Sequence, residues 1–272
     1  MPRPQTVLSF ATLAPAMTLL SKIRKAAATG HGIAGARWRQ RGSASEAPVY
    51  LDIGARGGLP PRWQWVQQAG LIRPAFVEAD PEEADRLRTS LPDALVLSHA
   101  LGDIDGEDAL LHVTREPGRS SVLEPDMDVL APFGAEPWSV ARTVPITLRR
   151  FDRVWPSGWP VPAMVKVDVQ GFELRVLQGF GDLLDEVCCV ELETVISPLY
   201  CGQPSLVEVT AFMRSRGFGL VRLASMGLFG GLELIEFNAF WIRKDRHADD
   251  VARLWRDINA VGDQRRIVDW GH

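Results

Sequence analysis

Two oppositely charged residues interrupt an otherwise apolar run of this sequence. Lys166 and Asp168 stand two positions apart near the end of that run. Side chains alternate along a strand with period two, so both charges point to the same face of the strand. Burying a charge without a purpose is costly, and a mutual ion pair reduces the cost. The pair therefore indicates a candidate functional site at the end of this strand.

A glycine-rich loop follows another apolar run. Residues 52–58 contain Gly54, Gly57 and Gly58, which let the backbone approach a ligand closely and adopt positive φ angles. The helix expected after this loop offers unpaired N–H groups to an anionic group. The loop lacks the full G-x-G-x-x-G pattern, which argues against a dinucleotide. A nucleotide-like ligand and a simple tight turn both remain open.

A third candidate is the carboxylate of Glu78, which ends a short apolar run 26 positions after Asp52. In dinucleotide-binding folds an acidic residue at this place hydrogen-bonds the ribose hydroxyls. The alternative is that Glu78 caps the helix that begins near Pro81, for which Asp80 is better placed. We therefore expect Glu78 to bind a ribose.

Short apolar runs alternate with amphipathic ones along the chain, the pattern of parallel strands joined by crossing helices. Strands are expected at residues 49–53, 75–78, 94–100, 164–168, 187–194, 218–223 and 234–242. Helices are expected from Pro60-Pro61 onward and at residues 81–91, 172–178, 204–216 and 248–258. The last two strands are close enough in sequence to pair antiparallel. The sequence thus predicts an α/β fold with one open Rossmann-like sheet, mostly parallel with an antiparallel edge strand, and helices on both faces.

The chain is expected to divide into a short N-terminal segment and one domain. Residues 1–47 are predicted to form a helix and a polar linker, and residues 48–272 the domain. Within the domain, residues 102–150 are less regular, with turn signals around two candidate short strands. We expect this stretch to be an insertion over the site.

The predicted N-terminal helix lies in the apolar stretch 7–20. This stretch is interrupted by Pro15 and is shorter than a bilayer-spanning helix. We expect it to pack on the domain or on another copy in a homo-oligomer, rather than to act as a targeting signal.

The composition is that of a soluble globular protein. The 272 residues are 46% hydrophobic and 24% charged, which excludes disorder, collagen and coiled coil. The net charge of −4, with both signs mixed, gives no general attraction to nucleic acid or anionic membranes. The three cysteines suit neither a disulfide framework nor a metal-ligand spacing, so we expect a cytoplasmic location. The histidines are scattered and no metal site is expected, although an oxygen-only magnesium site leaves little trace in a sequence.

The chain from about residue 49 to 242 resembles the FkbM family of S-adenosylmethionine-dependent methyltransferases. The resemblance rests on three motifs, at residues 52–55 with Gly58, at residues 76–81, and at residues 166–173 with Leu177 and Gly179. The third motif is the most specific, because the first two are shared with many methyltransferase families. Arg56 stands where the family usually has Asn, and it leaves the glycines of the loop in place.

The resemblance implies that residues after the first three strands bind S-adenosylmethionine. Those that would line its methionine part are Gly54, Ala55 and Gly58. Asp52 would hold the glycine loop or the amino group, and Glu78 the ribose. The residues that would face the adenine are Ala100 and Leu101.

Methyl transfer is an in-line displacement on an activated sulfonium, so the protein mainly aligns the acceptor and removes its proton. Asp168, beside the sulfonium and the acceptor by this resemblance, is the expected base or orienting group, with Lys166 beside it. Glu193, also at a carboxyl end and one strand over, is a second catalytic candidate, with a surface carboxylate as the alternative. We therefore expect O-methylation of a small molecule, natural product or glycan.

Two other functions compete with this interpretation. An NAD(P)-dependent oxidoreductase uses a similar sheet, and the absent G-x-G-x-x-G pattern counts against it. A catalytically silent cofactor-binding module would act through partner contacts. The intact Glu78 and the Lys166–Asp168 pair argue against such a module. The acceptor would be selected by residues 102–150 and by the loop at 197–203, whose shapes do not follow from the sequence.

Overall fold

The computed structural model describes residues 47–229 and 233–261 of the chain. The predicted N-terminal helix and linker, residues 1–47, lie outside the described residues except for Ala47. Residues 262–272 of the predicted domain also lie outside them. Within the described ranges, no helix has both the length and the apolar character needed to cross a bilayer.

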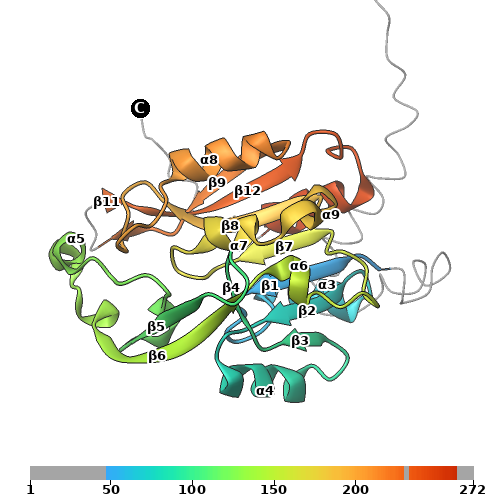
Figure 1. Cartoon of the computed structure of the whole chain (residues 1–272). Coiled ribbons are helices and arrows are strands. Elements are labelled where there is room, and N and C mark those ends of the chain that lie inside the picture. The colour runs from blue at the N-terminus through green and yellow to red at the C-terminus, as the bar shows by residue number, and fades with distance from the viewer. Residues whose placement is uncertain (1–46, 230–232, 262–272) are drawn as a thin grey trace, which may run out of the picture.

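The centre of the fold is a seven-stranded sheet in the order β3-β2-β1-β7-β8-β12-β9 (Figure 1). Its strands are β1 (Val49–Ile53), β2 (Arg73–Val77), β3 (Leu95–Leu97), β7 (Met164–Val167), β8 (Cys189–Val195), β9 (Phe218–Ser225) and β12 (Glu236–Arg243). The first five in spatial order pair in parallel. Strand β12 runs antiparallel to both β8 and the edge strand β9. This confirms the mostly parallel sheet with antiparallel pairing at one edge, and puts the reversed strand one place in from that edge.

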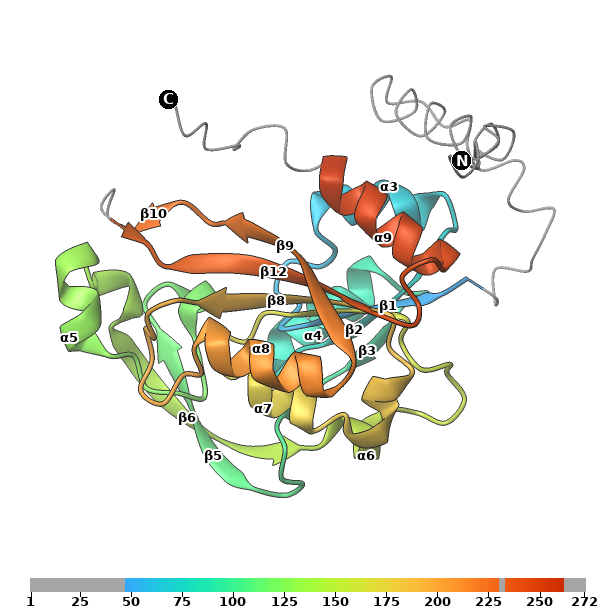
Figure 2. The ribbon, with the colours of Figure 1, turned by 90° about the horizontal axis from the view of Figure 1, so that it is seen from above.

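Helices cover both faces of the sheet, as predicted. On one face lie α6 (Phe151–Val154), α7 (Glu173–Gln178) and α8 (Leu206–Ser215). On the other lie α3 (Pro61–Gln68), α4 (Pro81–Ser90) and α9 (Asp250–Val261). Figure 2 shows α3 and α9 on the opposite side of the sheet from α7 and α8. Because both faces are covered, all five residues of β1 are buried, and apart from Asp52 the strand is an apolar run.

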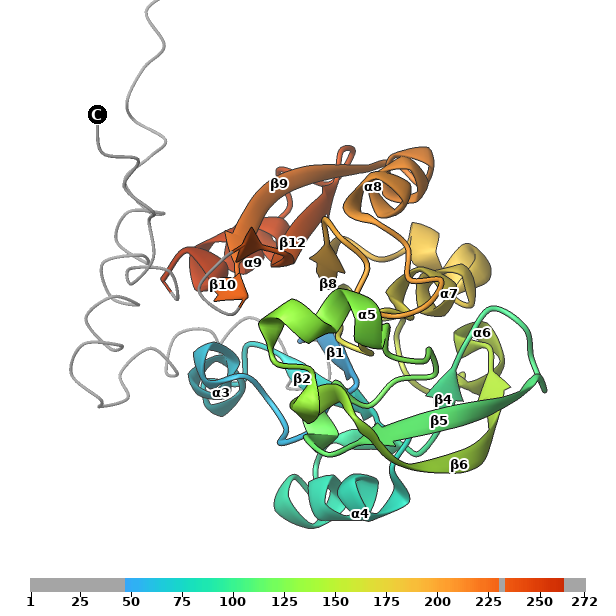
Figure 3. The same cartoon turned by 90° about the vertical axis from the view of Figure 1, so that its left-hand side faces the viewer.

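The insertion is more regular than its sequence predicts. Strands β4 (Ala100–Leu101), β5 (Asp108–Thr114) and β6 (Val140–Arg149) form a second sheet in the order β4-β6-β5. Strands β5 and β6 make an antiparallel hairpin that lies across the ends of β1 and β2 in Figure 3. The remaining elements of the described residues are short, namely η3 (Pro117–Arg119), α5 (Met127–Leu130), η4 (Ala131–Phe133), η5 (Glu136–Trp138), η6 (Gly181–Asp185), β10 (Leu228–Phe229) and β11 (Glu233–Leu234).

The predicted strand at residues 94–100 is two strands in two sheets. The chain pairs with β2 as far as Leu97, and Ala100 then pairs with Leu148 of β6. An apolar run gives the same sequence pattern whether it stays in one sheet or passes to another. This change of sheet matters for function, because it brings the start of the insertion from the end of β3 to the site.

A close backbone contact joins the start of the insertion to the end of α7. A Cβ atom at Gly179 would lie 2.1 Å from the carbonyl oxygen of Gly102. On the same helix, the Arg175 guanidinium forms ion pairs with Asp103 and with Glu107. The end of α7 therefore fixes the first residues of the insertion.

We expect Gly179→Ala to lower the free energy of unfolding by about 1 to 3 kcal/mol. The added methyl would clash with the carbonyl group of Gly102, which as part of the backbone cannot rotate away. Urea unfolding followed by circular dichroism measures this change. Gly158→Ala is the matched control, since a Cβ at Gly158 meets no atom within 4 Å. Equal stability of the two variants would contradict the contact.

Candidate functional site

The carboxyl ends of β1, β2 and β7 open into a cavity of about 740 Å³. The order of the sheet reverses between β1 and β7, since β2 and β3 follow on one side and β8 on the other. Ligands of open α/β sheets bind at such a reversal. The predicted site residues that line this cavity are Asp52, Gly54, Gly58, Glu78, Ala100, Leu101, Lys166 and Asp168.

Two predicted residues lie elsewhere. Ala55 is only 2% exposed and belongs to the buried apolar cluster that contains Trp63 and Leu87. It therefore anchors the loop to the core and does not line the cavity. Glu193 is not among the lining residues either. It lies behind Gln170, whose amide nitrogen donates to it at 3.0 Å.

Gly54 brings three strand ends together. Its φ is +77°, and a Cβ there would lie 1.9 Å from the carbonyl oxygen of Asp168. The Gly54 N–H donates to the carbonyl oxygen of Val77 at 2.9 Å, and the Asp168 N–H donates to that of Ile53 at 3.0 Å. Only glycine allows this approach, which sets the loop directly against the end of β7.

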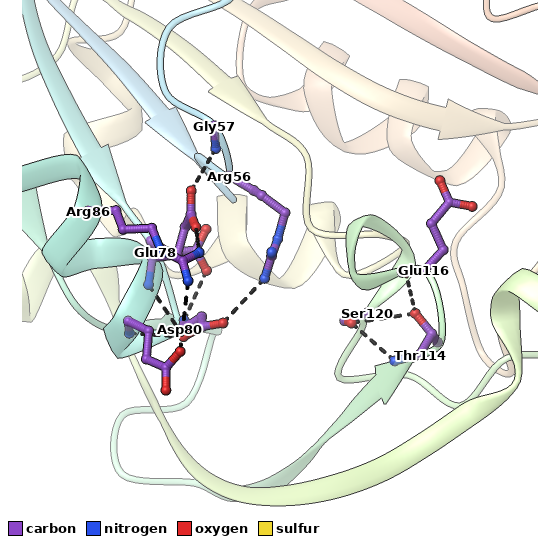
Figure 4. A network of polar contacts seen from close by, with 10 residues as sticks. Arg56, Gly57, Glu78, Asp80, Arg86, Thr114, Glu116 and Ser120 are labelled. Atoms are coloured by element: carbon purple, nitrogen blue, oxygen red, sulfur yellow. Dashed lines mark hydrogen bonds and ion pairs between the residues drawn. The ribbon is translucent and has the colours of Figure 1, made fainter. Parts of the chain in front are cut away.

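The glycine loop is held by a residue that sequence reasoning missed. The Gly57 N–H donates to Oε1 of the buried Glu83 at 2.9 Å (Figure 4). This hydrogen bond is the main reason that the pKa of Glu83 falls below its usual value. The spacing Asp80-x-x-Glu83 is typical of a capping box, in which the glutamate turns back to the N-cap residue. Glu83 instead reaches across to the loop, a role expected of Asp52.

Glu78 directly follows β2 and faces the cavity. Its Oε1 accepts from the Asp80 N–H at 2.9 Å, and no hydrogen bond to its other oxygen is found among the described residues. Burial raises the pKa of Glu78, with the Asp80 N–H and the charge of Arg56 opposing it. Asp80 caps α4 and also pairs with Arg56 at 3.3 Å, as Figure 4 shows. Capping is thus the role of Asp80, which leaves one oxygen of Glu78 for a ligand.

The charged centre of the site contains one cation and two anions. Lys166 Nζ lies 3.3 Å from Oδ1 of Asp52 and 3.1 Å from Oδ2 of Asp168. The Asp52 side chain is 1% exposed, whereas 32% of the Asp168 side chain is exposed. The structure therefore confirms the Lys166–Asp168 ion pair and adds Asp52 to it.

The pKa values of the two carboxylates beside Lys166 are shifted in opposite directions. Burial raises the pKa of Asp52 to about 7, against the charge of Lys166. Burial also acts to raise the pKa of Asp168, but Lys166 and a hydrogen bond from Gln170 outweigh it, and this pKa is lowered. For Lys166, burial acts to lower the pKa and the two carboxylates raise it. At neutral pH, Lys166 and Asp168 are the fully charged pair.

Gln170 connects this pair to Glu193. Its Nε2 donates to Oδ1 of Asp168 and to Oε1 of Glu193, each at 3.0 Å, and Ser121 Oγ donates to its carbonyl oxygen at 2.6 Å. Among the described residues it is the one non-glycine residue with a positive φ, +57°. Such a conformation costs about 1 to 3 kcal/mol and persists where surrounding contacts impose it. Gln170 lies in the third sequence motif, but the motif did not indicate this role.

The pKa values of the two acids bridged by Gln170 are shifted in opposite directions. Burial, followed by the charge of Asp168, raises the pKa of Glu193 well above its usual value. Glu193 therefore keeps its proton to a higher pH than Asp168 does. Of the two, Asp168 is the anion that meets the cavity. Within residues 47–229 and 233–261, no group of three or more His, Cys, Asp or Glu side chains is arranged to hold a metal ion.

The family model described as the methyltransferase FkbM domain matches residues 52–220, which is more than half of the chain. This chain belongs to the FkbM methyltransferase family. The match covers the glycine loop, the end of β2 and the Lys166–Asp168 motif, and S-adenosylmethionine is the cofactor. The family assignment excludes the nicotinamide-dependent oxidoreductase.

Solved structures similar to this FkbM protein are distant in sequence. Magnesium protoporphyrin IX methyltransferase from Synechocystis, with bound S-adenosylmethionine, is 9% identical, with 89% of this chain and 87% of that chain covered and a TM-score of 0.41. A TehB-like methyltransferase from Corynebacterium glutamicum is 11% identical, with 85% and 99% covered and a TM-score of 0.37. No curated protein matches the chain.

The residues around the cavity fit this cofactor. A Cβ at Gly57 would meet no atom within 4 Å, so the loop leaves room beside its exposed backbone. Glu78 offers a carboxylate oxygen at the end of β2, as a ribose requires. Ala100 and Leu101 give the wall an apolar stretch suited to a flat base.

We expect Lys166→Met to lower the free energy of unfolding by about 3 to 5 kcal/mol at pH 7, because two buried carboxylates lose their cation. An acid whose pKa is higher in the folded state loses folding stability as pH rises from its unfolded to its folded pKa. Without Lys166, burial is left to raise the pKa of Asp168 as well as that of Asp52. The deficit should therefore shrink from pH 7 to pH 5, as Asp168 takes up a proton in the variant and not in the wild type. Urea unfolding at both pH values measures it.

The control for this substitution is Lys244→Met, which removes an exposed lysine outside the cavity. We expect this variant to unfold like wild type at both pH values. A Lys166→Met deficit that is equal at pH 5 and pH 7 would show that the carboxylates do not depend on Lys166 for their charge.

Proposed function

We propose that this protein transfers the methyl group of S-adenosylmethionine to a hydroxyl oxygen of a small molecule, natural product or glycan. The observation that carries the proposal is the state of Asp168, an ionised carboxylate at the end of β7 with a third of its side chain open to the cavity. A hydroxyl acceptor must lose its proton as its oxygen attacks carbon. A carboxylate in this position can orient that hydroxyl and take the proton.

The cofactor is proposed to lie along the ends of β1, β2 and β4. The backbone at Gly54 and Gly58 would border its methionine part, and the free oxygen of Glu78 would accept hydrogen bonds from the ribose hydroxyls. Ala100 and Leu101 would contact the adenine. Bound here, S-adenosylmethionine supplies a methyl group on a positively charged sulfur that is already activated for in-line displacement.

The chain's own residues would align the acceptor. Asp168 accepts a hydrogen bond from the acceptor hydroxyl, which fixes the direction of the attacking oxygen. Lys166 and Gln170 each hold one oxygen of Asp168, at 3.1 and 3.0 Å, so the carboxylate cannot rotate freely. The same contacts lower its pKa, which makes Asp168 a strong orienting group and a weak base. Glu193 accepts a hydrogen bond from the Gln170 amide and so fixes the group that holds Asp168.

We expect Glu78→Gln to weaken S-adenosylmethionine binding about 10- to 100-fold, because a hydrogen bond to a charged group is replaced by one to a neutral amide. Isothermal titration calorimetry measures the Kd. Glu82→Gln, an exposed glutamate on the first turn of α4, is the matched control and should bind like wild type. Unchanged affinity in Glu78→Gln would remove the ribose contact from the proposal.

We expect Asp168→Asn to lower kcat for methyl transfer about 100-fold or more, while the Kd for S-adenosylmethionine changes little. The assay is transfer of a radiolabelled methyl group to a panel of phenols, sugars and hydroxy acids. Asp182→Asn, an exposed aspartate outside the cavity, is the control. Full activity in Asp168→Asn would overturn its catalytic role.

The same assay decides between kinds of function. Transfer to amines or thiols without transfer to hydroxyls would overturn O-methylation and leave the family assignment intact. Cofactor binding by wild type without transfer to any acceptor class would favour the catalytically silent module.

A further inference from the structure

Not all of the charges that line the cavity have a partner among the residues that the structure describes. Lys166 is paired with Asp52 and Asp168, and Arg56 with Asp80. Glu78 has the proposed role at the ribose. Arg142 also lines the cavity, and no ion pair or hydrogen bond of its guanidinium is found among the described residues. The cavity therefore has one cation without an ion-pair partner among the described residues, and it lies on the wall formed by the β5–β6 hairpin.

The register of the hairpin sets Arg142 at the end of an apolar surface. Leu111 pairs with Val144, and Val113 pairs with Arg142. These two pairs are two positions apart on each strand, so their side chains share one face, and all four residues line the cavity. We call this face, Leu111, Val113, Arg142 and Val144, the roof.

The two ends of β6 serve different parts of the cavity. At one end Leu148 pairs with Ala100 and Arg149 with Leu101, the residues proposed to contact the adenine. Arg142 is six residues from Leu148, which is about 20 Å of extended strand. The roof's cation is thus far from the adenine end.

Hydrogen bonds tie the Arg142 end of the roof to the loop that carries Asp168. The N–H of His112, which precedes Val113, donates to the carbonyl oxygen of Ser121 at 2.8 Å. Ser121 Oγ donates to the carbonyl oxygen of Gln170, and Gln170 Nε2 donates to Asp168. On the other side of Val113, the Thr114 N–H donates to Ser120 Oγ at 3.2 Å (Figure 4). These contacts place the apolar pairs and Arg142 at the acceptor end of the cavity.

We propose that the roof binds the acceptor, and that the acceptor is a hydroxylated organic oxyanion with an apolar body. The guanidinium of Arg142 would pair with its carboxylate, sulfate or phosphate group, since a planar fork of donors matches two oxygens of such a group. Leu111, Val113 and Val144 would cover the apolar body, leaving the hydroxyl to reach Asp168. The inference rests on the proposed function, because it is Asp168 that would receive the hydroxyl.

The test uses the full chain saturated with S-adenosylhomocysteine and calorimetric titration with matched pairs of ligands. The pairs are 4-hydroxybenzoate, 4-hydroxyphenylacetate and 4-hydroxycinnamate, each against its own carboxamide. We expect at least one carboxylate to bind wild type ten times more tightly than its amide, the effect of one charge-assisted hydrogen-bonded pair.

Variants assign that preference to the roof. We expect Arg142→Gln to reduce the preference to below twofold and Arg142→Lys to retain part of it. Arg214→Gln, which removes an exposed arginine on α8 outside the cavity, should behave like wild type. Circular dichroism and the Kd for S-adenosylmethionine should be unchanged in all three.

Three results would overturn the inference. The first is the absence of any carboxylate preference in wild type, whether or not the ligands bind. The second is an unchanged preference in Arg142→Gln. The third is weaker S-adenosylmethionine binding in Arg142→Gln, which would assign the guanidinium to the cofactor's own carboxylate. Failure of wild type to bind S-adenosylmethionine would instead reject the proposed function.

Discussion

The site depends on a single ammonium group held between two carboxylates. Asp52 and Lys166 are partners in the β1–β7 register, so the contact crosses the point at which the sheet order reverses. Asp168 follows on the same chain and meets the same ammonium. Because Asp52 and Lys166 are largely buried, removing one charge leaves its partner unpaired at high cost. The interaction therefore joins the two central strands and at the same time sets the charge of the residue that faces the cavity.

Residues with unfavourable backbone conformations lie close to this interaction. Gly54 allows the loop after β1 to lie against the carbonyl oxygen of Asp168. Gln170, two residues after Asp168, has a left-handed backbone conformation. Sequences tend to break local rules at functional sites and to compensate with contacts elsewhere. Here the compensation comes from Glu83, from Ser121 in the insertion and from the acids that Gln170 bridges.

Patterns local to the sequence predicted the strands, the crossing helices and the Lys166–Asp168 pair. These features depend on period, turn residues and the alternation of side chains, all of which a short window contains. The partner of Asp52, the reach of Glu83 to Gly57 and the bridge through Gln170 could not be predicted in this way. Each depends on the register between segments far apart in the chain, and a capping-box spacing such as that of Glu83 even suggests a different partner. The insertion was underestimated for the same reason, since its long hairpin is specified by cross-strand pairs and not by either strand alone.

The ammonium contact also has a consequence for how the chain folds. Lys166 and Asp52 are 114 residues apart in sequence, and the whole insertion lies between them. Closing so long a loop costs entropy before any contact repays it, so pairing of β1 with β7 belongs to the slow, non-local part of folding. In the native structure the glycine loop lies directly against the end of β7, at the carbonyl oxygen of Asp168. A ligand that needs both strand ends would then bind the assembled domain and not its partly folded precursors, and its concentration would shift the folding equilibrium toward the native state.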